Sequence, residues 1–176
     1  MMAWTTPRTW LTGEIVTAGN FNLYLKDNLN YLYNVPRFKA RQSTALTLYN
    51  GGVLVDCNTE VYDTDNMFTA TDGTCDIRRN GVYTLGCCIR EANNSGVGVR
   101  EARIDYEDGS GRIIAQTVIR IGNDSSQGHT VTATGDAYCT IGMTPSFWHY
   151  QNSGASIAAS IGANAYPAIW GSWRGI

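Results

Sequence analysis

The chain has 176 residues, of which 43% are hydrophobic and 16% are charged, with a formal net charge of −2. This composition predicts one globular domain with an appendage and excludes a disordered chain. The low charge, without a basic cluster, excludes a surface for DNA or RNA, so we expect no nucleic-acid partner. Because so few residues are charged, we expect part of the surface to be buried against other chains.

The first ten residues, MMAWTTPRTW, lack a basic start followed by an apolar run, and no later apolar run is long enough to span a bilayer. We therefore expect a protein that folds in a cytoplasm and has no membrane partner. Two tryptophans, Trp4 and Trp10, stand on either side of Pro7. This pattern predicts an extended segment whose aromatic side chains pack on a partner.

A helix is predicted from Ala18 to Asn34, with Thr17 as its N-cap. Apolar residues recur along it at spacings of four, four and three, at Phe21, Leu25, Leu29 and Leu32. Two interpretations stay open, because this stripe can contact another protein or can pack on the chain's own second domain. The stripe is too short for a coiled coil that stands alone.

Residues 35–42 read as a linker between two structural units. Pro36 disfavours helix in the residue before it, and the segment VPRFKARQ carries local positive charge. Residues 1–34 are therefore predicted to form an N-terminal segment, and residues 43–176 a second domain. On this interpretation a chain that starts near Ser43 folds by itself.

The segment TWLTGEIVTAGNFNLYLKDNLNYL, from Thr9 to Leu32, contains Trp10, a Thr-Gly-Glu turn at 12–14, a Val-Thr-Ala cap at 16–18 and Lys-Asp-Asn at 26–28. It resembles the N-terminal segment of minor structural proteins of tailed bacteriophages, departing from it in Gly19 and in Lys26, where arginine is commoner. The resemblance implies a virion component, assembled in the host cytoplasm, whose N-terminal segment anchors it to capsid or tail proteins. The anchoring residues would be Trp4, Trp10, Phe21, Leu25, Leu29 and Leu32.

Residues 43–176 read as short strands joined by turns. Strands are predicted at 45–48 and 53–57, on either side of an Asn50-Gly51-Gly52 turn. Residues 75–90 predict a central hairpin with Asn80-Gly81 at its turn. In its second strand the residues of one face are apolar and predicted to be buried: Tyr83, Leu85, Cys87 and Ile89.

The remaining residues continue this pattern. After an exposed loop, EANNSGVG, the segments 99–106 and 112–121 predict a second hairpin. A strand with a turn or bulge at Gly135-Asp136 follows, then FWHYQ, and then two last strands that end near Arg174. Eight or so strands without helices predict a mainly β, two-sheet antiparallel sandwich or jelly roll.

Several short motifs of this domain come in a characteristic order. They are Phe68-Thr69-Ala70, Cys75-Asp76-Ile77, Gly81-Val82-Tyr83, Gly135-Asp136 and Trp170-Gly171-Ser172-Trp173. Their order resembles that in the jelly rolls of tumour necrosis factor and of the complement globular heads. This resemblance implies a homotrimer packed around aromatic and small residues.

No catalytic or metal-binding constellation stands out. His129 and His149 have no sequence partner, and no G-x-S-x-G or C-x-x-C motif occurs. The acidic residues of one loop region lack the spacing of a calcium loop: Asp56, Glu60, Asp63, Asp65 and Asp72. The five cysteines are an odd number and are predicted to be reduced core residues. We therefore expect no enzyme, no metal and no cofactor.

Two functions remain after this search. The first is a non-enzymatic virion structural protein, namely a trimeric decoration, head-fibre or tail-associated protein. The alternative is a receptor-binding protein whose jelly-roll head binds a glycan of the host surface. The aromatic residues expected at trimer or glycan contacts are Trp148, Tyr150, Trp170 and Trp173. A depolymerase would need paired carboxylates facing a groove.

Overall fold

The computed structural model describes residues 5–92, 97–106, 112–122, 128–162 and 166–175. Its internal contacts divide the chain into two units, Met1–Val35 and Pro36–Ile176, which we call the N-terminal unit and the head. Each unit is described by itself.

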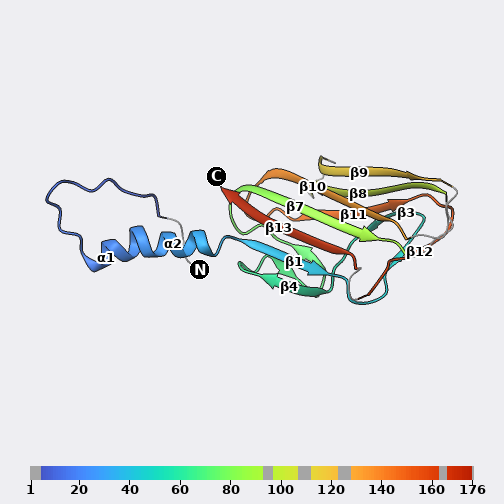
Figure 1. Ribbon diagram of the computed structural model, residues 1–176, viewed down its shortest axis with the longest axis horizontal. Helices are drawn as coiled ribbons and strands as arrows, with labels where there is room; N and C mark the ends of the chain where they lie inside the picture. The colour runs from blue at the N-terminus through green and yellow to red at the C-terminus, as the bar shows by residue number, and fades with distance from the viewer. Residues whose placement is uncertain (1–4, 93–96, 107–111, 123–127, 163–165, 176) are drawn as a thin grey trace. The chain divides into compact units, whose positions relative to one another are not determined.

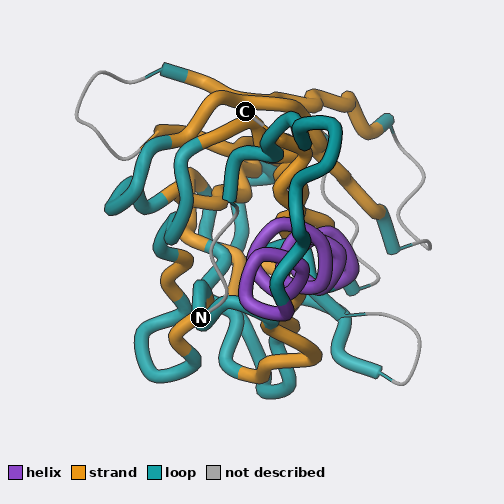
Figure 2. Tube along the Cα trace, turned by 90° about the vertical axis from the view of Figure 1, so that its left-hand side faces the viewer, coloured by secondary structure: helices purple, strands orange, loops and turns teal. Residues whose placement is uncertain are grey.

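The N-terminal unit contains one continuous helix made of three parts: α1 (Ala18–Phe21), a π-helical turn (Asn22–Lys26) and α2 (Asp27–Tyr33) (Figure 1). Thr17 is the N-cap, and its side chain accepts a hydrogen bond from the Asn20 amide at 3.2 Å. The sequence pattern did not predict the π-helical turn, in which the Asp27 amide donates to the Asn22 carbonyl. Figure 2 shows the helical residues as a single coil.

The head is built from two main antiparallel sheets, as the alternation of its segments predicted (Figure 1). The five-stranded sheet has the order β10 (Thr130–Cys139), β7 (Gly81–Arg90), β13 (Ala168–Gly175), β1 (Arg37–Arg41), β4 (Thr59–Asp63). The four-stranded sheet has the order β3 (Gly51–Leu54), β11 (Pro145–Gln151), β8 (Gly98–Tyr106), β9 (Ile113–Ile121). Two strand pairs complete it: β12 (Ile157–Ala158) with β2 (Thr47–Leu48), and β5 (Phe68–Thr69) with β6 (Thr74–Cys75).

Strand β7 supplies much of the core between the sheets. Its residues Tyr83, Leu85, Cys87 and Ile89 are fully buried, as their alternation predicted. The core continues into the other strands through residues such as Phe38, Ile104, Phe147 and Ile169. Because each strand turns its apolar face inward, the sandwich has a core of its own.

The predicted central hairpin is not formed. Strand β7 pairs with β10 and β13, whereas Cys75 pairs with Phe68 in the small β5–β6 ladder. The segment between them turns away, because Ile77 is fully buried and its amide donates to the Met143 carbonyl at 2.8 Å. A strand that is apolar on both faces, as β7 is, needs a long partner on each side, which five residues before the turn do not supply.

The predicted linker, residues 35–42, is also wrong. Residues 37–41 form β1, which lies between β13 and β4 in the five-stranded sheet. Phe38 and Ala40 are fully buried, whereas the basic residues that alternate with them, Arg37, Lys39 and Arg41, are exposed or half-buried. The head thus begins at Pro36 and not at Ser43. The positive charge of this segment marks the outer face of a strand.

Two further turns differ from their predictions. Strands β2 and β3 pair with β12 and β11, so the turn between them connects different ladders. Strand β10 runs through Gly135-Asp136 without a turn or bulge. A Cβ on Gly135 would lie 2.9 Å from the Ile114 carbonyl oxygen, so this glycine serves the close approach of β9.

The cysteines are free, as predicted. Four are buried and Cys88 is half-buried. Burial raises the pKa of the Cys57 and Cys87 thiols to about 12. These thiols therefore pack as small apolar side chains.

Candidate functional site

The segment before the helix is held against one face of it by Asn28. The side chain of this buried residue accepts a hydrogen bond from the Thr5 amide at 3.0 Å and donates one to the Thr5 carbonyl at 2.8 Å. It also donates to the Tyr24 carbonyl at 3.2 Å. One side-chain amide thus satisfies both backbone groups of Thr5 and fixes where the segment crosses the helix.

The guanidinium of Arg8 lies against two aromatic rings, those of Trp10 and Tyr24. Its guanidinium carbon is 4.7 Å from the centre of the Trp10 ring and 5.7 Å from that of Tyr24, and the two rings meet edge to face at 6.0 Å. Arg8 also forms an ion pair with Glu14, whose carboxylate accepts the Leu11 amide at 3.1 Å. These contacts shape the turn that returns the chain to the helix.

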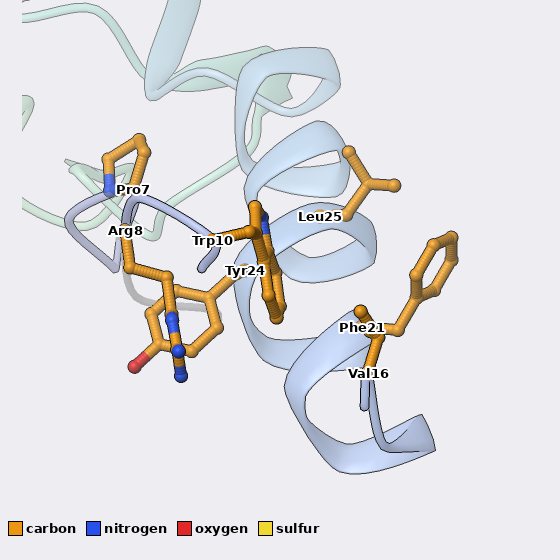
Figure 3. A pocket seen from close by; sticks show the side chains of 7 residues that line it. All are labelled: Pro7, Arg8, Trp10, Val16, Phe21, Tyr24 and Leu25. Carbon is orange, nitrogen blue, oxygen red and sulfur yellow. The ribbon is translucent and has the colours of Figure 1, made fainter. Parts of the chain in front are cut away.

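The turn and the helix enclose a groove of about 250 Å³, which we call the N-terminal groove (Figure 3). Its lining is apolar except for one charged residue: Pro7, Arg8, Trp10, Val16, Phe21, Tyr24 and Leu25. Trp10 is 39% exposed and Phe21 is 53% exposed. A groove of this kind can take an apolar side chain of another protein.

The apolar stripe continues from the groove along the helix. Phe21, Leu25, Leu29 and Leu32 are 43 to 57% exposed. The segment held by Asn28 borders the same groove as Phe21 and Leu25, yet the stripe keeps this exposure among the residues that the structure describes. Burying apolar area yields about 25 cal/mol per Å², and the stripe is therefore a surface on which a partner gains free energy.

The structure thus brings together most of the residues predicted to anchor the chain. Trp10, Phe21 and Leu25 line the groove, and Leu29 and Leu32 extend the stripe. Trp4 lies outside the described residues. Val16 and Tyr24, which the sequence did not single out, complete the groove.

The four aromatic residues expected at trimer or glycan contacts do not meet. Trp148 and Tyr150 alternate with buried residues on β11 and lie on the outer face of the four-stranded sheet. Trp170 lies on the outer face of the five-stranded sheet, where its indole occupies the space above Gly86. Trp173 packs against the core and donates to the Asn80 carbonyl at 3.1 Å, so it is a poor contact residue.

Trp170 borders a hollow of about 290 Å³ on its sheet. The hollow is also lined by Ala168 and by polar and basic residues: Lys39, Cys88, Arg90, Thr130 and Tyr166. Arg41 stacks on Tyr166 at 5.2 Å from the ring centre. This lining, which combines the aromatic rings of Tyr166 and Trp170 with the basic groups of Lys39 and Arg90, makes a second candidate surface, distinct in chemistry from the N-terminal groove.

Sequence reasoning missed a buried ionic cluster in the head. The Arg100 Nε lies 2.6 Å from Glu91 Oε2, and the His149 Nε2 lies 3.0 Å from Glu91 Oε1. All three side chains are fully buried, although Glu91 was predicted to begin an exposed loop. Burial raises the pKa of the Glu91 carboxyl, but hydrogen bonds with His149 and Arg100 outweigh it and leave that pKa below its ordinary value.

This cluster has a structural role in the head. Arg100 lies on β8, His149 on β11, and Glu91 directly follows β7, so the ion pairs join three segments distant in sequence. No solvent-accessible atom of the cluster is available to a substrate, because each side chain has 0% exposure. The alternation of β11 could have placed His149 inward between Phe147 and Gln151.

The acidic residues of the predicted loop have structural roles as well. Asp63 accepts the amides of Asp65 and Phe68 at 3.0 and 2.7 Å, and Asp65 pairs with Arg79 at 2.9 Å. Within the described ranges, no three His, Cys, Asp or Glu side chains are placed to share a metal ion. Nor is any helix among those residues both long and apolar enough to cross a membrane.

Comparison with known proteins shows similarity in fold. No protein-family model and no curated protein sequence matches the chain. The structure of Eiger TNF from S. frugiperda is 9% identical, covers 81% of this chain and 93% of its own, and gives a TM-score of 0.57. The globular domain of zebrafish complement 1qA is 15% identical, covers 78% of this chain and 96% of its own, and gives a TM-score of 0.50. The chain therefore has the jelly-roll fold of the tumour necrosis factor and complement 1q globular domains, as its motifs indicated.

Proposed function

We propose that this protein is a non-enzymatic structural component of a tailed-bacteriophage virion, anchored to the capsid or tail by its N-terminal unit. One observation carries the proposal: a head with a complete core follows a small unit whose groove and stripe remain exposed. The resemblance of residues 9–32 to phage structural proteins supplies the identity of the partner. The head would then decorate or extend the particle.

The head is proposed to act as a homotrimer. The likeness in fold to the tumour necrosis factor and complement globular domains supports self-association. The scarcity of charge, 16% of residues, supports it as well, because a surface buried between copies needs few charged groups. Light scattering of the purified protein at micromolar concentration tests this state, and a monomeric mass would exclude it.

The anchor is tested by comparing two purified proteins, the full chain and a chain that starts at Pro36. Each is mixed with virions that lack the native copy, and co-sedimentation is measured together with the melting temperature of the free protein. We expect both to fold and only the full chain to sediment with particles. If the shorter chain still sediments, attachment lies in the head.

A second candidate function is attachment to a host glycan. It is favoured by two aromatic surfaces of the head, one at Trp148 and Tyr150 and one at the Trp170 hollow. Sugar rings stack on aromatic faces, and Tyr150 is 38% exposed, whereas the Arg103 guanidinium, 5.8 Å from the Trp148 ring centre, is paired with Glu101 and Asp105. A glycan array with the Trp148→Ala and Trp170→Ala variants tests each surface separately, and an array without signal removes this function.

A further inference from the structure

The π-helical turn changes the spacing of the apolar stripe. In this turn the Asp27 amide bonds to the carbonyl five residues earlier, so the turn holds one residue more than an α-helical turn. The turn lies between Phe21 and Leu29, and it contains Leu25. Phe21 and Leu25 are four residues apart in the sequence. Because of the extra residue, the angle between them about the helix axis is close to that between two residues three apart in an α-helix.

With this correction the stripe has the spacing of a heptad seam. The intervals from Phe21 to Leu25, Leu29 and Leu32 become equivalent to three, four and three, the alternation of positions a and d. The same alternation is typical of a helix that packs on its own domain and of helices that pack along one another. Because the stripe is exposed within its own unit, the second arrangement accounts for it.

The rest of the helix surface fits this arrangement. The segment held by Asn28 borders the same groove as Phe21 and Leu25, and all four seam side chains remain at least 43% exposed. Lys26 is the charged residue immediately beside the seam, next to Leu25, and Asp27 follows it one residue further round the helix. The seam therefore presents apolar side chains to a second copy with little repulsion between like charges.

We propose that the stripe is a docking surface for the same stripe of other copies of this chain, so that the helices form a short parallel bundle. This inference rests on the trimeric state in the proposed function. The stripe would then be covered by the other copies. Phe21 and Leu25 also line the N-terminal groove, so its other side, with Pro7, Trp10 and Val16, would remain for the virion protein.

The energetics require the head to hold the copies together. The helix of residues 18–33 is only slightly longer than the roughly 12–15 residues below which isolated helices are marginal in water. Here residues 34–36 are all that separates α2 from β1. A tether of this length keeps each helix near its own head, and in a trimer it raises the local helix concentration to the order of millimolar.

Disulfide cross-linking of the full chain tests this bundle. A Leu32→Cys substitution places a thiol on the seam, and Asn30→Cys places one on the other side of the helix, both in a Cys88→Ser background that removes the half-buried native thiol. Under mild oxidation we expect Leu32→Cys to form covalent dimers at least roughly ten times faster than Asn30→Cys, because only seam positions bring two Cα atoms within disulfide range. Equal rates, or no cross-link at position 32 in a protein of trimeric mass, would overturn the bundle and leave the trimer intact.

Removal of the extra residue tests the phase of the stripe. Deleting Asn22 shortens the π-helical turn to an α-helical one and keeps Phe21 on the seam, so Leu32→Cys should cross-link at an unchanged or higher rate. A loss of cross-linking of about ten-fold or more would contradict the phase argument. A monomeric mass of the full chain would overturn the trimer and the bundle together, whereas binding to virions is measured in a separate experiment.

Discussion

The two units of this protein differ in the kind of side chain that they expose or bury against expectation. The N-terminal unit leaves apolar side chains in solvent, with Leu29 at 57% and Leu32 at 55% exposure. The head encloses charged ones, with Arg100, Glu91 and His149 at 0%. The head can bury these groups because each finds its partner inside the same fold. The apolar side chains of the N-terminal unit have no such cover among the residues that the structure describes, so we propose that this unit functions by contact with other chains.

This contrast predicts where the chain can be cut. A chain that starts at Ser43 lacks β1, which pairs with both β13 and β4 and places Phe38 in the core. We expect it to lose its cooperative unfolding transition. A chain that starts at Pro36 keeps β1 and should melt within ~3 °C of the full protein. Thermal melting followed by circular dichroism compares the two, and a stable Ser43 chain would show that β1 is dispensable.

Local patterns predicted the strands of the head better than their partners. The alternation of β7, β8 and β11 was visible, because one residue type points inward at every second position. The pairing of β7 with β10 and β13 depends on residues at least 40 positions away, which a short turn motif such as Asn80-Gly81 does not encode. The turn residues therefore predicted a hairpin at a place where β7 instead pairs with two longer strands.

The sequence predicted the apolar residues of the candidate site but not their geometry. The helical period indicated Phe21, Leu25 and Leu29, but the π-helical turn leaves no mark in composition. The cluster around Glu91 was missed for a related reason. A carboxylate next to a glycine-rich loop looks exposed until the strands that carry Arg100 and His149 are placed beside it.

Removing the carboxylate of Glu91 is expected to destabilise the head more than any single surface change. A Glu91→Ala variant leaves the charge of Arg100 buried without its 2.6 Å partner, which typically costs about 3–5 kcal/mol. Glu101→Ala is the control, because the half-buried Glu101 pairs with Arg103 at 3.6 Å and Arg103 keeps Asp105 as a partner at 2.9 Å, so the loss should be about 1 kcal/mol or less. Urea unfolding measures both, and similar losses would contradict a special role for the buried cluster.

A matched pair of tyrosines tests the predicted inner face of the five-stranded sheet. Tyr83 is fully buried and donates its hydroxyl to the Arg79 carbonyl at 3.1 Å, whereas Tyr138 on β10 is 53% exposed. Tyr83→Ala should lower the free energy of unfolding by about 3–5 kcal/mol, and Tyr138→Ala by less than about 1 kcal/mol. A small loss at Tyr83, measured by urea unfolding, would mean that the core tolerates a cavity at its centre.

Low pH should lower the free energy of unfolding of the head because the Glu91 carboxylate becomes protonated. The pKa of this carboxyl in the folded protein lies below its ordinary value of roughly 4.3, because its hydrogen bonds with His149 and Arg100 outweigh burial. Its contribution to stability is therefore complete above that ordinary value and is lost as the pH falls through the folded pKa. We expect urea midpoints to fall below about pH 4, with a flatter acid limb in Glu91→Gln.

The smallest expected effect is the most informative about the N-terminal unit. A Leu29→Asp substitution puts a carboxylate on the stripe, and a residue that is 57% exposed contributes little to the folding of its own chain. We expect the melting temperature of the head to change by less than about 2 °C, since the head has its own core. The same substitution should abolish cross-linking of a seam cysteine at position 32, because a desolvated carboxylate between helices lacks a partner. Asn30→Asp adds the same charge away from the stripe and should leave both measurements unchanged. A large drop in the head's melting temperature with Leu29→Asp would place the stripe in the core of its own chain, and the contrast between the two units would no longer hold.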